Sequence, residues 1–351
     1  SQAGSSINIF IGKYTGVHAD ATGSGTTNVI FMGCKAGYKN ESDAAVLIGQ
    51  GAGGHDSNKT AHGAVMIGKY AGYYSCSGCS IYIGCCAGAG SGTAADNTGH
   101  SNIAIGPHAA KSLTSGTQNI FLGRYVAANM TTGNCNLALG TTNLYCVTTG
   151  SYNIAIGRGA GGYIEDTSNK NVLIGAYAGS GVWGTTACPE AVVAVGHCAG
   201  YCNCGNSNTY VGFEAGVKGR TATRNTAVGR QALYTALDSG SDNVAIGYQA
   251  GCTLSTGEYN SLFGTKAGAD ITTGKYNVVV GAATTVADGT ADKQFKIGCN
   301  TSWWICGDSS FNIYDKDGNQ LNGGGGGSGW TPDDDGNLVA GTEAGDSLAS
   351  G

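Results

Sequence analysis

Cysteine is the residue type with the most potential for chemistry in this chain, which has 14 cysteines among 351 residues. Three local groups have spacings that could bind a metal ion or form a disulfide: Cys76-x-x-Cys79, Cys85-Cys86 and Cys198-x-x-x-Cys202-x-Cys204. A structural zinc site requires two such pairs at a consistent separation, or partner histidines, and neither occurs here in a regular pattern. Free thiols are therefore favoured over disulfides, and disulfides over a metal site, with all three kept as alternatives.

Residues suited to acid–base or nucleophilic catalysis show no consistent arrangement. The six histidines lie mostly in turn positions, with no acidic residue at a fixed offset and no nucleophile motif. The sparse Asp and Glu residues form no pair suited to glycoside hydrolysis. Asp315, Asp317 and Asn319 resemble the start of a calcium-binding loop, but the rest of that loop is absent and a plain turn is favoured. The sequence predicts a protein that is not an enzyme and uses no cofactor or metal.

The elements that must position these residues are short and repeat along the whole chain. An apolar triplet runs into a glycine, usually followed two residues later by Ala-Gly, as in Asn243-Val-Ala-Ile-Gly247-Tyr-Gln-Ala-Gly251. A unit of this length cannot bury a core alone, but it can form one turn of a coil that stacks on its neighbours. The sequence therefore predicts an all-β chain with a parallel β-solenoid of about 17 coils of 16–22 residues. The anchor glycines are residues 12, 33, 49, 68, 84, 106, 123, 140, 157, 175, 196, 212, 229, 247, 264, 281 and 298.

Numbered from the anchor glycine as zero, position −1 is apolar in all seventeen units and position −3 is mostly Ile or Val. Because side chains alternate along a strand, we expect these two positions to share one face and to line the inside of the coil. Position −2 should then point outward, yet it is also apolar in almost every unit, which is typical of a strand buried on both faces. We expect a second copy of the chain to cover position −2. The candidate interface residues are Phe10, Phe31, Leu47, Met66, Phe121, Leu173, Tyr210 and Leu262.

The remaining positions of the unit read as corners and turns. Asparagine occupies position −4 in eleven units, where it tolerates left-handed backbone and could hydrogen-bond from coil to coil as a ladder. Glycine at 0 and +4 supplies the unusual dihedral angles of tight corners, and alanine at +3 fits where the next coil is close. Positions +1 and +2 should be exposed, and the Ser/Thr/Gly-rich linkers should form turns at the outer edge.

Composition and charge exclude several classes of protein. Glycine accounts for 63 residues, but there are only three prolines and no strict three-residue period, so collagen is excluded. Hydrophobic residues make up 41 % and charged residues 12 %, which argues against disorder. The net charge of −5 and the lack of a basic stripe make nucleic acid a poor partner. No apolar run approaches the roughly 18 residues of a membrane-spanning helix, so we expect no membrane insertion.

The repeat changes near its C-terminal end. We expect four segments: a β-solenoid shaft at 1–286, an aromatic-rich β capping segment at 287–322, a Gly-rich linker at 323–330, and the start of a further repeat segment at 331–351. Trp303-Trp-Ile305 and Phe311-Asn-Ile-Tyr314 should provide the large aromatic residues that close the open end of the solenoid. Because the last segment begins a repeat and stops, we expect this sequence to be one part of a longer polypeptide.

The motif Asn-x-Ala-Ile-Gly-x-x-Ala-Gly, with Thr-Thr-Gly or Ser-Gly between copies, resembles the left-handed parallel β-roll in the heads of trimeric autotransporter adhesins. It is still more similar to the repeats of bacteriophage tail fibres, particularly those of marine phages, and the resemblance covers about residues 8–286. It implies a left-handed β-roll and a homotrimer with three coils side by side. The uneven spacing, the cysteines, and the lack of a heptad-repeat stalk or membrane anchor within these residues favour the phage interpretation.

Two functions follow as expectations. The first is a structural shaft or spacer of a phage tail fibre or tailspike, located on the virion, contacting other fibre or virion proteins and involved in host attachment. The alternative is a cellular surface adhesin or extracellular matrix filament. Tyrosines that follow the anchor glycines could also stack on sugar rings of a host-surface glycan, although packing at the coil edge is the favoured role of these residues. These candidates are Tyr14, Tyr70, Tyr125, Tyr177 and Tyr248.

Overall fold

The computed structural model divides the chain into two units, Ser1–Ser207 and Asn208–Gly351, and each is described by itself. The described residues contain strands and turns and no helix. They are residues 7–17, 27–54, 61–76, 78–90, 98–164, 167–181, 189–218, 221–235, 239–300, 302–308, 310, 312–321, 330–332 and 338–340.

The strands of the first unit are β1 (Ile9–Ile11), β2 (Ile30–Met32), β3 (Val46–Ile48), β4 (Val65–Ile67), β5 (Ile81–Ile83), β6 (Ile103–Ile105), β7 (Ile120–Leu122), β8 (Leu137–Leu139), β9 (Ile154–Ile156), β10 (Val172–Ile174) and β11 (Val193–Val195). The strands of the second unit are β12 (Thr209–Val211), β13 (Thr226–Val228), β14 (Val244–Ile246), β15 (Ser261–Phe263), β16 (Val278–Val280), β17 (Phe295–Cys299), β18 (Ser302–Gly307), β19 (Ile313–Asp315), β20 (Trp330–Pro332) and β21 (Leu338–Ala340).

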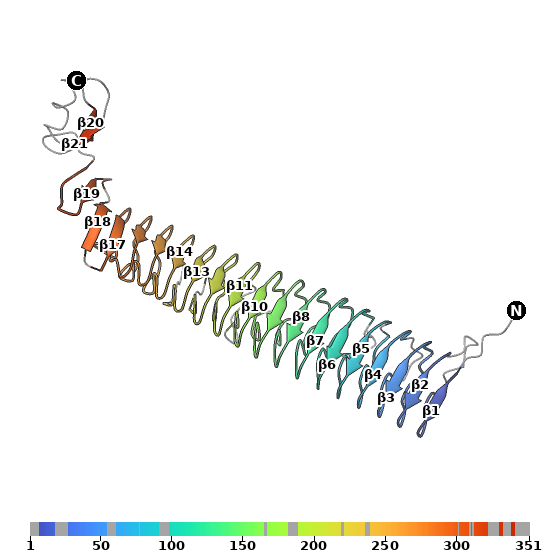
Figure 1. The fold of residues 1–351 in the computed structure, drawn as a ribbon. Helices are drawn as coiled ribbons and strands as arrows, with labels where there is room; N and C mark the ends of the chain where they lie inside the picture. The colour runs from blue at the N-terminus through green and yellow to red at the C-terminus, as the bar shows by residue number, and fades with distance from the viewer. Residues whose placement is uncertain are drawn as a thin grey trace, which may run out of the picture. The chain divides into compact units, whose positions relative to one another are not determined.

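Each coil contributes one short strand, and consecutive strands pair in parallel and in register from β1 to β11 in the first unit and from β12 to β17 in the second (Figure 1). Ala104 in β6, for example, pairs with Phe121 in β7, and Ala245 in β14 pairs with Leu262 in β15. Equivalent positions of the repeat therefore lie directly above one another. The predicted parallel β-solenoid is confirmed in each unit.

The assignment of the two strand faces from the sequence is wrong. The central residue of each strand, at position −2, points into the coil, whereas positions −3 and −1 are half-buried or exposed. Seven of the eight predicted interface residues are 0–1 % exposed within a single chain and cannot reach a sister chain; Phe10, in the first described coil, is the exception at 44 %. The buried seven are Phe31, Leu47, Met66, Phe121, Leu173, Tyr210 and Leu262.

The interior is filled mainly by residues outside the strands, which explains why one inward side chain per strand is enough. Alanine at +3, such as Ala109, is fully buried, as expected for a site of close approach. Position +7 adds large side chains, including Leu113, Met130 and Ile271, which are also fully buried. Leu113 and Ile271 are the first residues of Ser/Thr/Gly-rich linkers that were expected at the outer edge, so these linkers begin inside the core.

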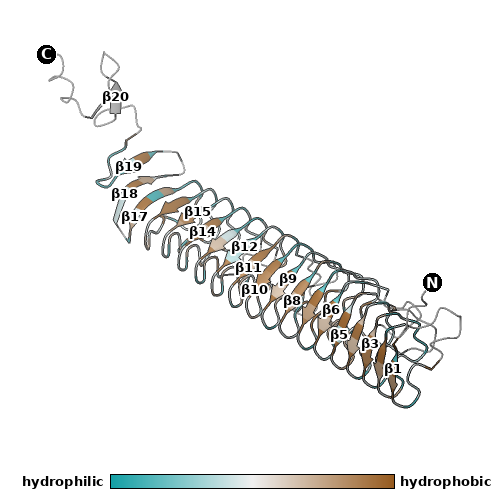
Figure 2. Ribbon diagram, turned by 45° about the vertical axis from the view of Figure 1, so that its right-hand side comes forward, coloured by the Kyte–Doolittle hydropathy of each residue, from teal (hydrophilic) through white to brown (hydrophobic). Residues whose placement is uncertain are grey.

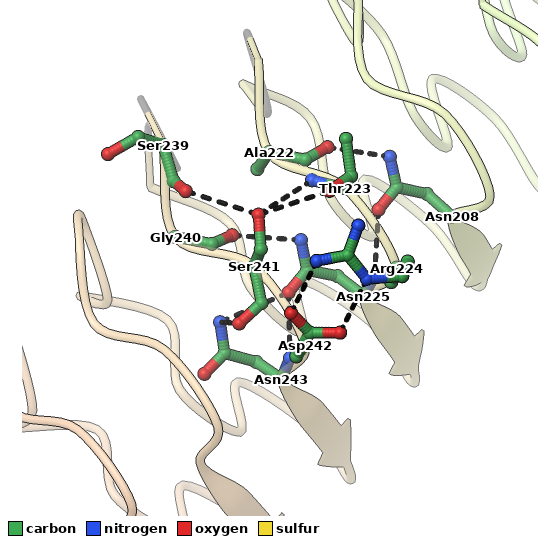
Figure 3. Close-up of polar contacts among 10 residues, drawn as sticks. All are labelled: Asn208, Ala222, Thr223, Arg224, Asn225, Ser239, Gly240, Ser241, Asp242 and Asn243. Atoms are coloured by element: carbon green, nitrogen blue, oxygen red, sulfur yellow. Dashed lines mark hydrogen bonds and ion pairs between the residues drawn. The ribbon is translucent and has the colours of Figure 1, made fainter.

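Asparagines at position −4 form the hydrogen-bond ladder that their periodicity predicts. In the first unit, Asn119 Nδ2 donates to Asn102 Oδ1 at 3.0 Å, and Asn136 Nδ2 donates to Asn119 Oδ1 at 3.0 Å. Figure 3 shows the ladder of the second unit, where Asn243 Nδ2 donates to Asn225 Oδ1 at 3.0 Å. The left-handed backbone expected at asparagine lies instead at position −5, for instance at Gln118.

The anchor glycines form the tight corners expected of them. Gly106 has a φ of +129°, and a Cβ at this position would lie 2.5 Å from the carbonyl oxygen of Gly123, the anchor of the next coil. A side chain is therefore excluded both by the backbone conformation and by the spacing of the coils. Position +2 also has positive φ in consecutive coils, as at Tyr125, so its side chain has a fixed direction.

The C-terminal segments differ in part from expectation. Strand β17 pairs in parallel with β16, which extends the solenoid beyond residue 286, and β18 and β19 then turn back as antiparallel strands. Trp303 is half-buried, but Trp304 is 65 % exposed and does not close the end of the coil. Most of the predicted linker and Phe311 lie outside the described residues. Strand β21 pairs antiparallel with β20, so residues 338–340 do not start a parallel coil.

Asp315, Asp317 and Asn319 lie in a turn at the end of β19, as the sequence predicts. Asp315 Oδ1 accepts hydrogen bonds from the backbone N–H groups of Asp317 at 3.0 Å and Asn319 at 2.8 Å. The carboxylate is thus used to hold its own turn, and these bonds lower the pKa of Asp315.

Candidate interaction surfaces

The outward side of the strands carries two columns of side chains, at positions −3 and −1, which we call the apolar sheet face. Position −1 is apolar in every strand from β1 to β16, and position −3 is apolar except at Thr209, Thr226 and Ser261 in the second unit. Its most exposed members are Ile9, Ile11, Met32, Ile120, Leu122, Ile174, Val211, Ile246, Phe263 and Val278, with exposed fractions of 36–54 %. Figure 2 shows the strands of the first unit as the hydrophobic part of each coil. No residue of β1–β16 is charged. Soluble monomers rarely leave so continuous an apolar surface in water, so this face is a candidate for contact with another chain.

Position +2 forms a second ladder at the corner that follows the strands. His108 and Tyr125 stack there with ring centroids 4.8 Å apart and planes 5° apart. Cations at position +1 lie over several of these rings, including Lys69 over Tyr70 at 5.3 Å and Arg158 over Tyr177 at 5.5 Å. These contacts agree with the predicted packing of tyrosine at the coil edge.

The structure brings together only two of the five candidate tyrosines. Tyr125 and Tyr177 line one pocket of about 590 Å³, to which Tyr145, Tyr163 and Lys111 also contribute. Sequence reasoning missed those three residues, because they follow the corner and are brought to the pocket only by coil stacking. Tyr14, Tyr70 and Tyr248 lie elsewhere. Tyr14 is 51 % and Tyr248 38 % exposed, and Tyr70 packs edge-on against Tyr73.

The cysteines give no developed site among the residues that the structure describes. Thirteen of them are described and none forms a disulfide, whereas Cys188 lies outside the described residues. The Sγ atoms of the neighbours Cys85 and Cys86 are 3.6 Å apart, and burial, together with the contact to Cys85, raises the pKa of Cys86. Across all the residues that the structure describes, no group of three or more Cys, His, Asp or Glu side chains could hold a metal ion.

Within the described ranges, no helix has the length and apolar character required to cross a membrane. Comparisons of the chain with protein-family models, with curated proteins and with solved structures find no match. Function must therefore be inferred from the surfaces themselves.

Proposed function

We propose that this chain is a structural fibre protein that assembles as a homotrimer through its apolar sheet face. It serves as the shaft or spacer of a phage tail fibre or tailspike, contacts other fibre or virion proteins, and takes part in host attachment. The coils are of the left-handed β-roll type. The observation that carries this proposal is the uncharged apolar face that runs from strand to strand within each unit.

The repeat makes this face self-complementary. Equivalent residues lie at the same height in every coil, so copies placed side by side would match two apolar columns in the first unit and the apolar column at position −1 in the second. A leucine, isoleucine or phenylalanine loses contact with water when a neighbour covers it, and each buried Å² contributes roughly 25 cal/mol. Many half-exposed side chains per chain would therefore give a permanent contact rather than a transient one.

The ladders suit a stiff spacer. A ladder asparagine such as Asn119 bonds to the neighbouring coils on both sides, through Asn102 and Asn136. Bending such a coil would stretch bonds that have no access to water, which resists deformation. The proposal therefore assigns the sheet face to assembly and the ladders to rigidity.

Sedimentation of the full chain tests the assembly. We expect a single species of three times the chain mass of 35.1 kDa. Leu122→Glu would place an unpaired charge on the covered face, which costs several kcal/mol when water is excluded, and should give monomers. The matched control is Thr132→Glu, at an exposed turn of the same coil, which should remain trimeric. A monomeric wild type, or equal behaviour of both variants, would reject the trimer.

Location needs a separate measurement. We expect mass spectrometry to detect the chain in purified virions. Its recovery from washed cell envelopes, and not from virions, would favour the cellular adhesin.

A further inference from the structure

The ladder at position +2 is interrupted in the first unit, and the interruption forms the 590 Å³ pocket. Tyr125 and Tyr177 occupy position +2 three coils apart, and the two coils between them carry Thr142 and Gly159 at this position. Three steps at the usual strand spacing place the two tyrosine backbones about 14 Å apart. Where a ring would otherwise stack on the next, the coil edge is hollow.

Backbone hydrogen bonds fix both walls and the floor of this hollow. The amide of Tyr125 donates to Pro107 O at 3.0 Å and that of Tyr177 to Arg158 O at 2.8 Å. On the floor, the Gly159 amide donates to Thr141 O at 2.9 Å. The ring of Tyr177 leans over the floor, since a Cβ at Gly159 would lie 2.9 Å from its Cδ1. The site is thus formed before any ligand arrives, which reduces the entropy lost on binding.

Aromatic rings and cations dominate the lining. Tyr145 and Tyr163 add two further rings to those of Tyr125 and Tyr177, and Lys111 and Arg158 add two positive charges. Among the described residues, the lining contains no Asp or Glu, and none of the ion pairs involves Lys111 or Arg158. The pocket therefore combines flat apolar faces and hydroxyl groups with positive charges available to a ligand.

We propose that this pocket binds an acidic saccharide, with its pyranose rings against the tyrosines and its carboxylate on Arg158 and Lys111. The C–H face of a sugar ring packs on an aromatic face, while phenolic hydroxyls exchange hydrogen bonds with sugar hydroxyls. Guanidinium and ammonium groups form charge-assisted hydrogen bonds with a carboxylate. The volume lies within the usual range of small-molecule sites, about 300–1,000 Å³. The site lies within one unit of one chain, so it goes beyond the proposed shaft and does not depend on the trimer.

Saturation-transfer NMR and calorimetry on the full chain test this site with three acidic probes: oligogalacturonate, hyaluronate oligosaccharide and oligosialic acid. We expect saturable binding of at least one, with a dissociation constant on the order of 1 mM or tighter. For oligogalacturonate, the matched neutral probe is its methyl ester, which should bind at least about tenfold more weakly because the charge-assisted bonds are lost. No binding of any acidic probe, or equal binding of the neutral ester of a probe that binds, would overturn the proposal.

Two variants connect binding to the pocket. Thr142→Tyr fills the hollow with a ring at a position whose φ of +57° matches that of Tyr177, so the coil should fold and binding should disappear. Arg158→Gln should weaken binding about tenfold or more. Its matched control is Arg230→Gln, which removes a cation at position +1 of another coil, over Phe213, and should bind as the wild type does.

Binding that survives Thr142→Tyr, in a variant whose circular dichroism matches the wild type, would place the ligand elsewhere and refute the assignment. Oligothymidylate serves as the competing probe, because aromatic rings with cations also suit single-stranded nucleic acid. We expect it not to bind, and preferential binding of oligothymidylate would equally overturn the saccharide proposal.

Discussion

Removal of one ladder asparagine should weaken the coil more than the loss of a single hydrogen bond suggests. Asn136 Nδ2 donates to Asn119 Oδ1 at 3.0 Å and to Gly150 O at 2.9 Å, and Asn136 Oδ1 accepts from the backbone N–H of Asn153 at 2.9 Å. The side chain is about 2 % exposed, so water cannot replace these partners. Asn136→Ala therefore leaves polar groups of both neighbouring coils without the bonds that this side chain provided.

The size of the effect follows from the bonds that remain. Asn119 Oδ1 still accepts from the backbone amide of residue 136, and Asn153 Nδ2 still donates to Ser168 O at 2.8 Å. The groups left without a partner are the backbone N–H of Asn153 and the carbonyl of Gly150. Each buried unpaired group costs about 1–3 kcal/mol. The substitution also removes the cost of burying the Asn136 side-chain amide, which offsets part of this loss, so we expect a destabilisation of about 2–4 kcal/mol.

Chemical denaturation followed by circular dichroism measures this change, and amide hydrogen exchange locates it. We expect a lower denaturation midpoint and loss of protection at the Asn153 amide. The matched control is Asn129→Ala, half-buried in an adjacent turn with no side-chain hydrogen bond among the described residues, which should change stability by less than about 0.5 kcal/mol. Equal midpoints for the two variants, with an unchanged exchange rate at Asn153, would refute the ladder as a source of stability.

Three further predictions concern the second unit. Tyr210 is fully buried, and its hydroxyl has no hydrogen-bond partner among the described residues. Tyr210→Phe should therefore stabilise the unit by about 1 kcal/mol in thermal denaturation, whereas Tyr248→Phe at the exposed edge should have no effect. A lower stability of Tyr210→Phe would contradict this prediction. Burial also raises the pKa of Tyr210, so its ultraviolet titration should begin only on unfolding. Hydrogen bonds from Arg224, with its positive charge, lower the pKa of Asp242. Their contribution to the stability of the unit is therefore present above the unfolded-state pKa of about 3.9 and is lost as the pH falls through the folded-state pKa. Asp242→Asn should therefore reduce the acid dependence of the thermal midpoint below about pH 4, and an unchanged acid dependence would show that this exposed pair contributes nothing.

Much of the coil could be predicted from the sequence because it depends on local periodicity. The spacing of the anchor glycines determines the length of each turn, and in-register stacking follows because equal units place equal residues at equal heights. The corner glycines were predictable for the same reason: every coil turns at the same position of the repeat, and the positive φ of that corner, as at Gly106, favours glycine. The asparagine ladder also followed, since residues such as Asn119 and Asn136 recur at one position and carry both a donor and an acceptor.

The direction of the strand faces was decided only by the tertiary structure. Alternation along a strand defines two faces, but it does not say which is inside when both are apolar, as with Phe121 between Ile120 and Leu122. The answer depends on how much of the interior other segments fill. Ala109 and Leu113 come from the corner and the linker, and they leave space for one strand side chain per coil.

The acidic-saccharide pocket likewise depends on stacking. Thr142 and Gly159 are unremarkable as single residues, and they form a hollow only because the coils bring them between Tyr125 and Tyr177. Tyr145 and Tyr163 reach the same place from turns that follow different corners. The sequence alone determined the period, the corners and the ladder, because these are properties of one repeat. The tertiary structure decided which face is buried and where the pocket lies, because those depend on contacts between residues far apart in the chain.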